Sequence, residues 1–257
     1  MRRWSRLGCG VQGLMARKSA RDVREEPLYS AAEAARYLRL PASTVRAWTF
    51  GQPYRHGPEQ RWFEPVIRPA NRDARRLSFL NLIELLVLAA IRRKHTVALP
   101  HVRRALRFLE KRFPSRHPLA DREFQTHGAD LFVEKFGAIV NVSRDGQVEM
   151  RESIDAYLQC VERDTRGVPV KLYLPALKPA KVERGIIVID PRIRFGRPVL
   201  DGTGIRTEIV IDRFRAGEPI ESLASDYGRS REEIKAIVRS ELPAAALPSH
   251  VAHAARS

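Results

Sequence analysis

Aspartates in the last third of the chain are the residues whose type could support catalysis. The candidates are Asp190, Asp201, Asp212 and Asp226. Three or four carboxylates that converge on Mg²⁺ or Mn²⁺ would polarise a phosphate and activate water for hydrolysis. However, Asp190 and Asp201 fall in expected turns, and the other two fall on polar faces of expected helices. Structural roles fit these positions better, and a metal-dependent nuclease stays as an alternative.

The sequence also lacks the short motifs that mark common catalytic sites. It contains no Walker phosphate loop, no Gly-x-Ser-x-Gly and no His-Glu-x-x-His. Its two cysteines, Cys9 and Cys160, are too far apart for a Cys-x-x-Cys metal site and are typical of a reducing compartment. We therefore expect a protein that is not an enzyme, with no catalytic residues, no metal and no cofactor.

Positive charge is concentrated in one segment. The 257 residues carry a formal net charge of +16, and residues 28–117 hold 18 Lys/Arg against 6 Asp/Glu. Residues 118–257 hold 21 of each and are neutral. A concentrated basic face attracts polyanions and releases counterions on binding phosphate, so double-stranded DNA is the expected partner of the first segment.

Nothing in the sequence predicts a membrane span or a secretory signal. The longest apolar run, residues 82–91, contains Glu84 and is shorter than the ~20 residues that a span requires. The arginines near the start are followed by a stretch that glycine and glutamine interrupt, which does not resemble the apolar core of a signal peptide. We expect a cytoplasmic protein without a membrane partner.

The elements that would position DNA-binding residues begin at Ser30. Ser30 and Glu33 form the pattern of a capping box, which predicts a helix start, and Pro41 separates this helix from a second one over residues 43–48. Helix, tight turn and helix are the proportions of a helix-turn-helix. On the second helix, we expect Ser43, Thr44 and Arg46 to face the duplex, with Arg46 contributing to sequence choice.

An irregular stretch over residues 51–77 follows, and its glycines, prolines, aromatics and arginines predict a wing. Such a hairpin can lie along phosphates or enter the minor groove. The basic residues expected to touch DNA from this stretch are Arg55, Arg61, Arg75 and Arg76. Two apolar helices should follow, and for the Arg103, Arg104 and Arg107 face of the second, phosphate contact and plain solvation both stay open.

The remaining sequence predicts a β-containing region and then three short helices. Residues 131–150 alternate around Asp145-Gly146 and favour a hairpin; residues 153–162 favour a short helix. Strands are expected at 170–174 and 186–189, joined by a linker over 175–181. After a glycine-punctuated turn, the helices should span about 207–216, 219–227 and 230–238.

Two parts of the chain resemble known families. Residues 28–113, including Leu77-Ser78-Phe79 and Leu99-Pro100-His101-Val102, are similar to a MerR-type winged helix-turn-helix. Residues 185–242, with Gly196-Arg197-Pro198-Val199 and Gly202-Thr203-Gly204-Ile205, resemble a trihelical domain found in antitoxins that are encoded beside PIN-like ribonuclease toxins. In this order, the two resemble the long VapB-type antitoxins.

The resemblance implies an autorepressor that binds operator DNA and also neutralises a PIN-like ribonuclease toxin. One departure is that many members have Arg-Ile-Pro after the Gly-Thr pair, where this chain has Gly204-Ile205-Arg206, so a role of that family arginine does not carry over. A toxin site built from carboxylates would accept a cation. The arginines in or beside the glycine-rich turn that could supply it are Arg192, Arg194, Arg197 and Arg206; the tail after Pro243 could insert instead.

The expected fold class is α+β, mainly α, with five consecutive parts. They are a disordered basic arm (1–27), a MerR-like winged helix-turn-helix (28–117), a β-containing connecting and dimerisation region (118–184), a trihelical toxin-binding domain (185–242) and a flexible tail (243–257). Because one short recognition helix reads few base pairs, we expect a homodimer or a larger hetero-oligomer with the toxin. A stand-alone MerR-like regulator is the main alternative function.

Overall fold

The computed structural model describes residues 22–93, 99–140, 143–178 and 181–241. Most of the expected arm and the whole expected tail, residues 243–257, lie outside these ranges. The expectation that the arm is unfolded is wrong for its last residues, because Val23–Glu25 (η1) forms a 3-10 turn that contacts the first long helix of the core. The described ranges form a mainly helical α+β fold.

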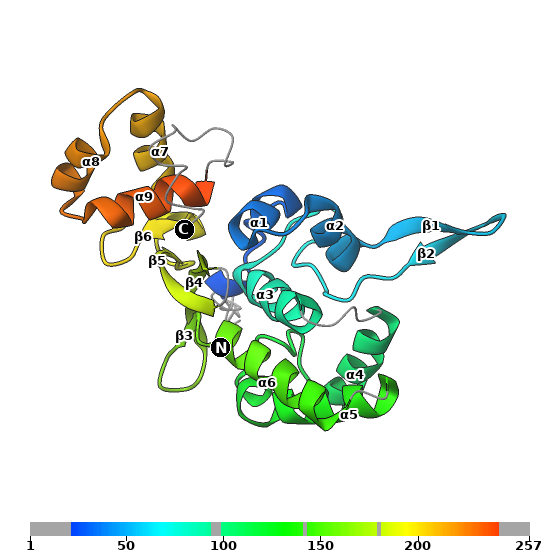
Figure 1. Ribbon diagram of the computed structural model, residues 1–257. Helices are drawn as coiled ribbons and strands as arrows, with labels where there is room; N and C mark the ends of the chain where they lie inside the picture. The colour runs from blue at the N-terminus through cyan, green and yellow to red at the C-terminus, as the bar shows by residue number, and fades with distance from the viewer. Residues whose placement is uncertain (1–21, 94–98, 141–142, 179–180, 242–257) are drawn as a thin grey trace, which may run out of the picture.

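The N-terminal region is a helix-turn-helix with a wing, as expected. Its elements are α1 (Ala31–Leu38), α2 (Ala42–Phe50), β1 (Gln52–His56) and β2 (Glu59–Phe63). Ser30 and Glu33 form the predicted capping box, in which each side chain bonds to the backbone N–H of the other residue. The wing projects away from the body of the molecule (Figure 1).

A buried helix forms the centre of the core. Every residue of α3 (Phe79–Arg93) from Phe79 to Leu88 is buried, which fits a helix that is apolar on nearly all sides. α3 contacts α1 and also α6 (Arg144–Leu158), which comes later in the chain. α4 (Leu99–Arg112) lies at the lower right of Figure 1. The winged helix-turn-helix is thus built directly onto this core.

The expected hairpin over residues 131–150 is wrong, because this segment is helical. A π-helical turn, η2 (Phe124–Gly128), leads into α5 (Ala129–Val140), and α6 (Arg144–Leu158) follows. Phe132, Val133 and Phe136 share one face at helical spacing, and the Phe132 and Phe136 rings stack with centroids 5.9 Å apart. Asp145-Gly146 lies in the first turn of α6 rather than at a strand reversal, since the Ser143 hydroxyl accepts a bond from the Gly146 N–H.

A four-stranded antiparallel sheet follows α6, with its strands in sequence order. The strands are β3 (Val161–Arg163), β4 (Pro169–Lys178), β5 (Lys181–Ile189) and β6 (Val199–Leu200). The expected helix over 153–162 begins earlier, as α6, and ends before β3. The expected linker over 175–181 is also wrong, because both strands extend into it and pair. Pro175 lies beside a register shift in β4, where a residue without an N–H is tolerated.

The three predicted C-terminal helices are present. They are α7 (Thr207–Arg215), α8 (Ile220–Tyr227) and α9 (Arg231–Glu241), and α9 packs against both others. In Figure 1 they lie at the opposite end of the molecule from the wing. Across the described ranges, no helix combines the length and apolar character that crossing a bilayer would need.

A buried polar network fixes the start of α3. The Asn81 side-chain oxygen accepts from the N–H of Ser78 at 3.1 Å and of Ala70 at 2.9 Å. Its amide nitrogen donates to the Arg68 carbonyl at 2.8 Å and to Glu84 Oε2 at 3.0 Å. One amide thereby joins the irregular segment that returns from the wing to the central helix, which helps to fix the position of the wing.

Glu84 extends this network to the loop after α4. Its Oε2 lies 2.9 Å from Nδ1 of His117, and both side chains are almost fully buried. Burial raises the pKa of the Glu84 carboxyl, and the bonds from His117 and Asn81 oppose this shift without cancelling it. A buried polar group that loses its partner costs the desolvation of the group left behind.

We expect His117→Ala to lower the free energy of unfolding by about 3 kcal/mol, because Glu84 would stay buried with only the bond from Asn81. In urea denaturation, the double variant with Glu84→Ala should lose clearly less than the two single variants combined. The exposed pair Arg61–Glu59 is a control, and Arg61→Ala should change stability by no more than about 0.5 kcal/mol. Additive losses at Glu84 and His117 would contradict the coupling.

Candidate nucleic-acid interface

The outer side of α2 carries the residues expected to read DNA. Ser43 and Arg46 are exposed and Thr44 is half-buried, whereas Val45 and Trp48 turn inward and are buried. Within the described ranges, the side chain of Arg46 makes no hydrogen bond or ion pair. Its guanidinium is therefore available for a base edge or a phosphate.

The wing presents its two arginines on opposite faces. Arg61 pairs across the hairpin with Tyr54, and Arg55 pairs with Gln60, so alternation along each strand separates the two cations. Arg61 is held by Glu59, with Nη2 and Oε2 3.0 Å apart. Arg55 is exposed and has no such partner among the described residues.

The base of the wing is held by α4 through Arg103. Nη2 of Arg103 donates to the Glu64 carbonyl, and its guanidinium lies 5.1 Å from the centroid of the Phe63 ring. Arg103 is thus used to support the wing, a role that the sequence did not indicate. A cation some forty residues from the aromatic that it contacts leaves no local pattern.

The turn that returns from the wing places Arg75 and Arg76 differently. Arg75, with a left-handed φ of +50°, stacks its guanidinium 4.7 Å from the centroid of Phe50 at the end of α2. Arg76 points to α1, where its Nη1 lies 3.8 Å from Glu33 Oε2. Arg75 therefore adjoins the expected recognition helix, and Arg76 adjoins the helix that supports it.

Glu33 of α1 also binds an arginine from the C-terminal half. Arg197 Nη1 donates to Glu33 Oε1 and to the Tyr37 hydroxyl at 3.4 Å. Burial would raise the pKa of the Glu33 carboxyl, but the bonds from Ser30 and Arg197 outweigh it and lower that pKa. Arg197, expected at a toxin surface, thus lies half-buried against the DNA-binding region.

The other three arginines expected at the toxin surface are exposed. Arg192 pairs with the buried Asp190 at 2.8 Å, and Nε of Arg194 donates to the Gly204 carbonyl at 3.2 Å. Arg206 lies 3.8 Å from Glu208 at the start of α7. Two of the three, Arg192 and Arg194, belong to the turn formed by residues 192–197, which we call the arginine turn.

The arginine turn has an unusual backbone. Arg194, Phe195 and Gly196 have successive φ values of +49°, +55° and +69°, all left-handed. For a residue with a side chain, this conformation costs about 1–2 kcal/mol. The Tyr29 hydroxyl, which precedes α1, donates to the Gly196 carbonyl at 3.0 Å. A Cβ at Gly196 would lie 2.1 Å from that hydroxyl oxygen, so only glycine fits beside Tyr29.

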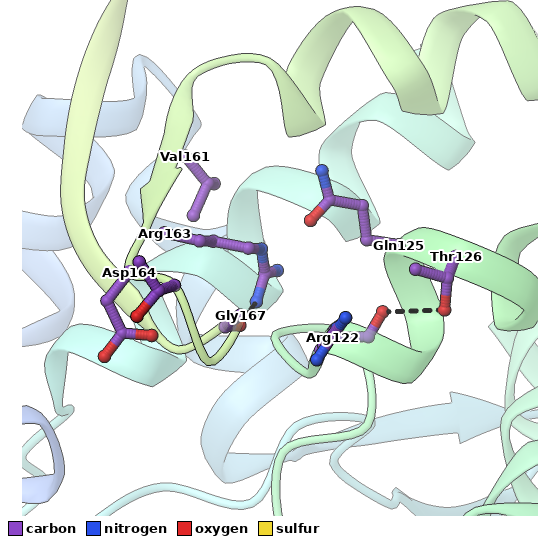
Figure 2. A pocket seen from close by; sticks show the side chains of 8 residues that line it. Arg122, Gln125, Thr126, Val161, Arg163, Asp164 and Gly167 are labelled. Carbon is purple, nitrogen blue, oxygen red and sulfur yellow. Dashed lines mark hydrogen bonds between the residues drawn. The ribbon is translucent and has the colours of Figure 1, made fainter.

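A separate cavity of about 510 Å³ lies between η2 and the turn that joins β3 to β4. In Figure 2, Arg163 extends from β3 toward Gln125 and Thr126, and Arg122 lies below them. Arg163 donates to the carbonyls of Gly167 at 3.0 Å and Ala120 at 2.8 Å, and its buried Nε has no partner among the residues that the structure describes. Burial lowers the pKa of Arg163 to about 10.

Comparison with known proteins agrees with this arrangement. The family described as "Putative DNA-binding HTH domain" matches residues 27–106, and "Protein of unknown function (DUF433)" matches residues 187–239. "Putative antitoxin VapB45" of Mycobacterium tuberculosis is 33% identical over 227 residues, which cover 81% of this chain and 91% of that protein. The chain belongs to the long VapB-type antitoxin family.

One further M. tuberculosis protein and one crystal structure from that organism are also similar to this VapB-type protein. "Uncharacterized protein Rv2308" is 30% identical over 86% of this chain and 93% of its own length. The crystal structure of Rv2018 matches with a TM-score of 0.60 and 26% identity, over 83% of this chain and 97% of that one. The resemblance thus extends well beyond the two matched domains.

The aspartates considered for a nuclease do not form one site in this VapB-type protein. Asp190 binds Arg192, Asp212 lies 3.5 Å from Arg215, and Asp226 lies 2.5 Å from Arg213. Within the described ranges, no three His, Cys, Asp or Glu side chains gather closely enough to hold a metal ion. Three of the four aspartates thus form ion pairs with arginines.

We expect Gly196→Ala to separate the arginine turn from α1, because the added Cβ would displace the Tyr29 hydroxyl. Gly228→Ala is the matched control, since Gly228 also has a left-handed φ, of +60°, but nothing lies within 4 Å of its Cβ position. Both variants carry the conformational cost, so Gly196→Ala should lose about 1–3 kcal/mol more in denaturant unfolding, the cost of the broken buried bond. Equal losses would contradict this role of Tyr29.

Proposed function

We propose that this protein is an autorepressor that binds operator DNA and neutralises a PIN-like ribonuclease toxin. The observation that carries the DNA half is the free, outward-facing Arg46 on α2, with exposed Ser43 beside it and the wing adjoining. The similarity to "Putative antitoxin VapB45" supports the toxin half. Residues 28–117 supply the DNA contacts and residues 185–242 the toxin contacts.

In this proposal, the residues that face DNA have different tasks. Arg46, Ser43 and Thr44 contact base edges from the major groove, and the wing and the following turn bind phosphates. The phosphate-binding residues are Arg55, Arg61, Arg75 and Arg76. The pairing of Arg61 with Glu59 and of Arg76 with Glu33 leaves Arg55 as the least engaged cation of the wing.

The toxin side rests on positive charge near the glycine-rich turn. Arg192, Arg194 and Arg206 are exposed and can approach carboxylates that bind the toxin's metal. Arg197 contributes to the same cationic surface and links it to α1. We also propose a homodimer or a larger assembly with the toxin, because two half-sites give the specificity that one short helix cannot.

We expect Arg46→Ala and Arg61→Ala to differ in how they weaken DNA binding by the full chain. Arg46→Ala should reduce the preference for a duplex from the protein's own promoter over a scrambled duplex, by about 1–3 kcal/mol for a bidentate base contact. Arg61→Ala should weaken both duplexes alike and lower the slope of log affinity against log salt by about 1.

Fluorescence anisotropy across a salt series measures both quantities. Arg215→Ala on α7 removes an exposed cation from the other end of the molecule and should change neither. Binding that does not depend on salt, or exchanged effects of Arg46→Ala and Arg61→Ala, would refute these assignments.

The Arg163 cavity favours a second candidate function, a stand-alone regulator that responds to a small anionic ligand. Arg122 also lines this cavity and makes no ion pair within the described ranges. If this candidate is right, citrate or phosphate raises the Tm of the wild type. Gln125→Glu adds a negative charge to the lining of the cavity and should abolish this shift in Tm. No Tm shift with either anion would remove this candidate.

A further inference from the structure

The arginine turn exposes an aromatic side chain to solvent. Phe195 is 85% exposed, the largest value for a big apolar side chain in the described part of the chain, where Val148 follows at 53%. A scattered exposed apolar residue needs no explanation. Phe195 differs because it has a left-handed φ of +55°, a conformation that disfavours a bulky side chain, between two other left-handed residues.

Several bonds hold this strained turn in place. The N–H groups of Ile193, Gly196 and Arg197 donate to the carbonyls of Asp190, Ile193 and Arg194 at 3.0, 2.9 and 3.1 Å. Tyr29 binds the Gly196 carbonyl, and Arg197 binds Glu33. Strained conformations persist where the surrounding structure over-determines them, and they cluster at sites of function.

The surroundings of Phe195 have the composition of a binding hot spot. Ile193 is also exposed, at 36%, and Arg192 and Arg194 supply positive charge on either side of it. An aromatic anchor with arginines at its rim, presented on a rigid turn, loses little conformational entropy on binding. The fitting partner has an apolar pocket beside a cluster of carboxylates.

We infer that Phe195 is the anchor of the toxin-binding surface: its ring enters an apolar pocket of the ribonuclease while Arg192 and Arg194 face the neighbouring carboxylates. This inference rests on the proposed function, which supplies the carboxylate-bearing partner. Phe195 is thereby named as a contact residue. The left-handed backbone of the turn exposes its ring to solvent. Duplex DNA and a second copy of this chain are the competing occupants that the experiment must separate.

The test uses full-length Phe195→Ala with Phe108→Ala as the matched control. Phe108 is an exposed phenylalanine on α4, at 39%, remote in sequence from the arginine turn. The partner is the PIN-like ribonuclease that the proposed function expects from the neighbouring reading frame; binding to it is measured by calorimetry, together with inhibition of its RNA cleavage. We expect Phe195→Ala to weaken toxin binding at least tenfold and to leave DNA binding and self-association unchanged, whereas Phe108→Ala binds like the wild type.

Phe195→Gly separates a binding role from a structural one. Glycine accepts the left-handed φ without strain, so this variant should keep or raise the Tm while toxin affinity falls. If the wild type binds the toxin and Phe195→Ala binds it with the same affinity, the inference is overturned and the proposed function is not. No toxin binding by the wild type overturns the proposed function and the inference with it, and a loss of DNA binding or of self-association in Phe195→Ala assigns the ring to that partner instead.

Discussion

The Glu33 carboxylate joins the N-terminal half of the chain to the C-terminal half. One oxygen completes the capping box that starts α1 and lies near Arg76, and the other accepts a bond from Arg197, 164 residues further along. A carboxylate near a helix N-terminus is already favoured by the helix dipole. The same charge that helps the helix-turn-helix to form therefore also holds the arginine turn against it.

The placement of the wing depends on a second set of interactions. Asn81 and Glu84 connect α3 to the irregular segment that returns from the wing and to His117, and Arg103 supports the wing at its base. Because these groups are buried or bonded to main-chain carbonyls, they offer few alternative arrangements. The exposed arginines of α2 and the wing are thus presented by a fixed scaffold, which reduces the ordering that DNA binding would require.

Local patterns in the sequence were sufficient for the elements that local chemistry decides. The capping box predicted α1, and glycine and proline with interspersed aromatics predicted the wing. The hairpin expected over 131–150 failed because short apolar runs fit both a strand and one face of a helix, and burial of Phe132 and Phe136 decides for the helix. The linker expected over 175–181 failed because β4 and β5 continue through their proline-containing stretch by pairing with each other.

The partners of the candidate site could not be read from the sequence for a different reason. In the sequence, nothing distinguishes Arg197 from Arg192 and Arg194. Only the folded structure places Arg197 beside Glu33 and Tyr37. Phe195 likewise gives no signal, since nothing in the letters Arg-Phe-Gly predicts successive left-handed residues. Contacts between distant segments determine both features, and periodicity does not report such contacts.

The arginine turn therefore depends on the folded DNA-binding region. Its left-handed backbone is offset by bonds from Tyr29 and to Glu33, and both residues precede or belong to α1. Arg36 of α1 also approaches Glu208 of α7, at 3.6 Å, so the contact between the two halves extends beyond the turn. A C-terminal fragment that begins near residue 185 would lack all three residues of the N-terminal half. It would keep the amino acids of the proposed toxin surface but lose the bonds to Tyr29 and Glu33. Without them, the positive φ values of the turn are expected to change to negative ones, which cost less free energy. Toxin binding therefore has to be measured with the full chain, because the bonds from the N-terminal half hold Phe195 in its exposed, left-handed conformation.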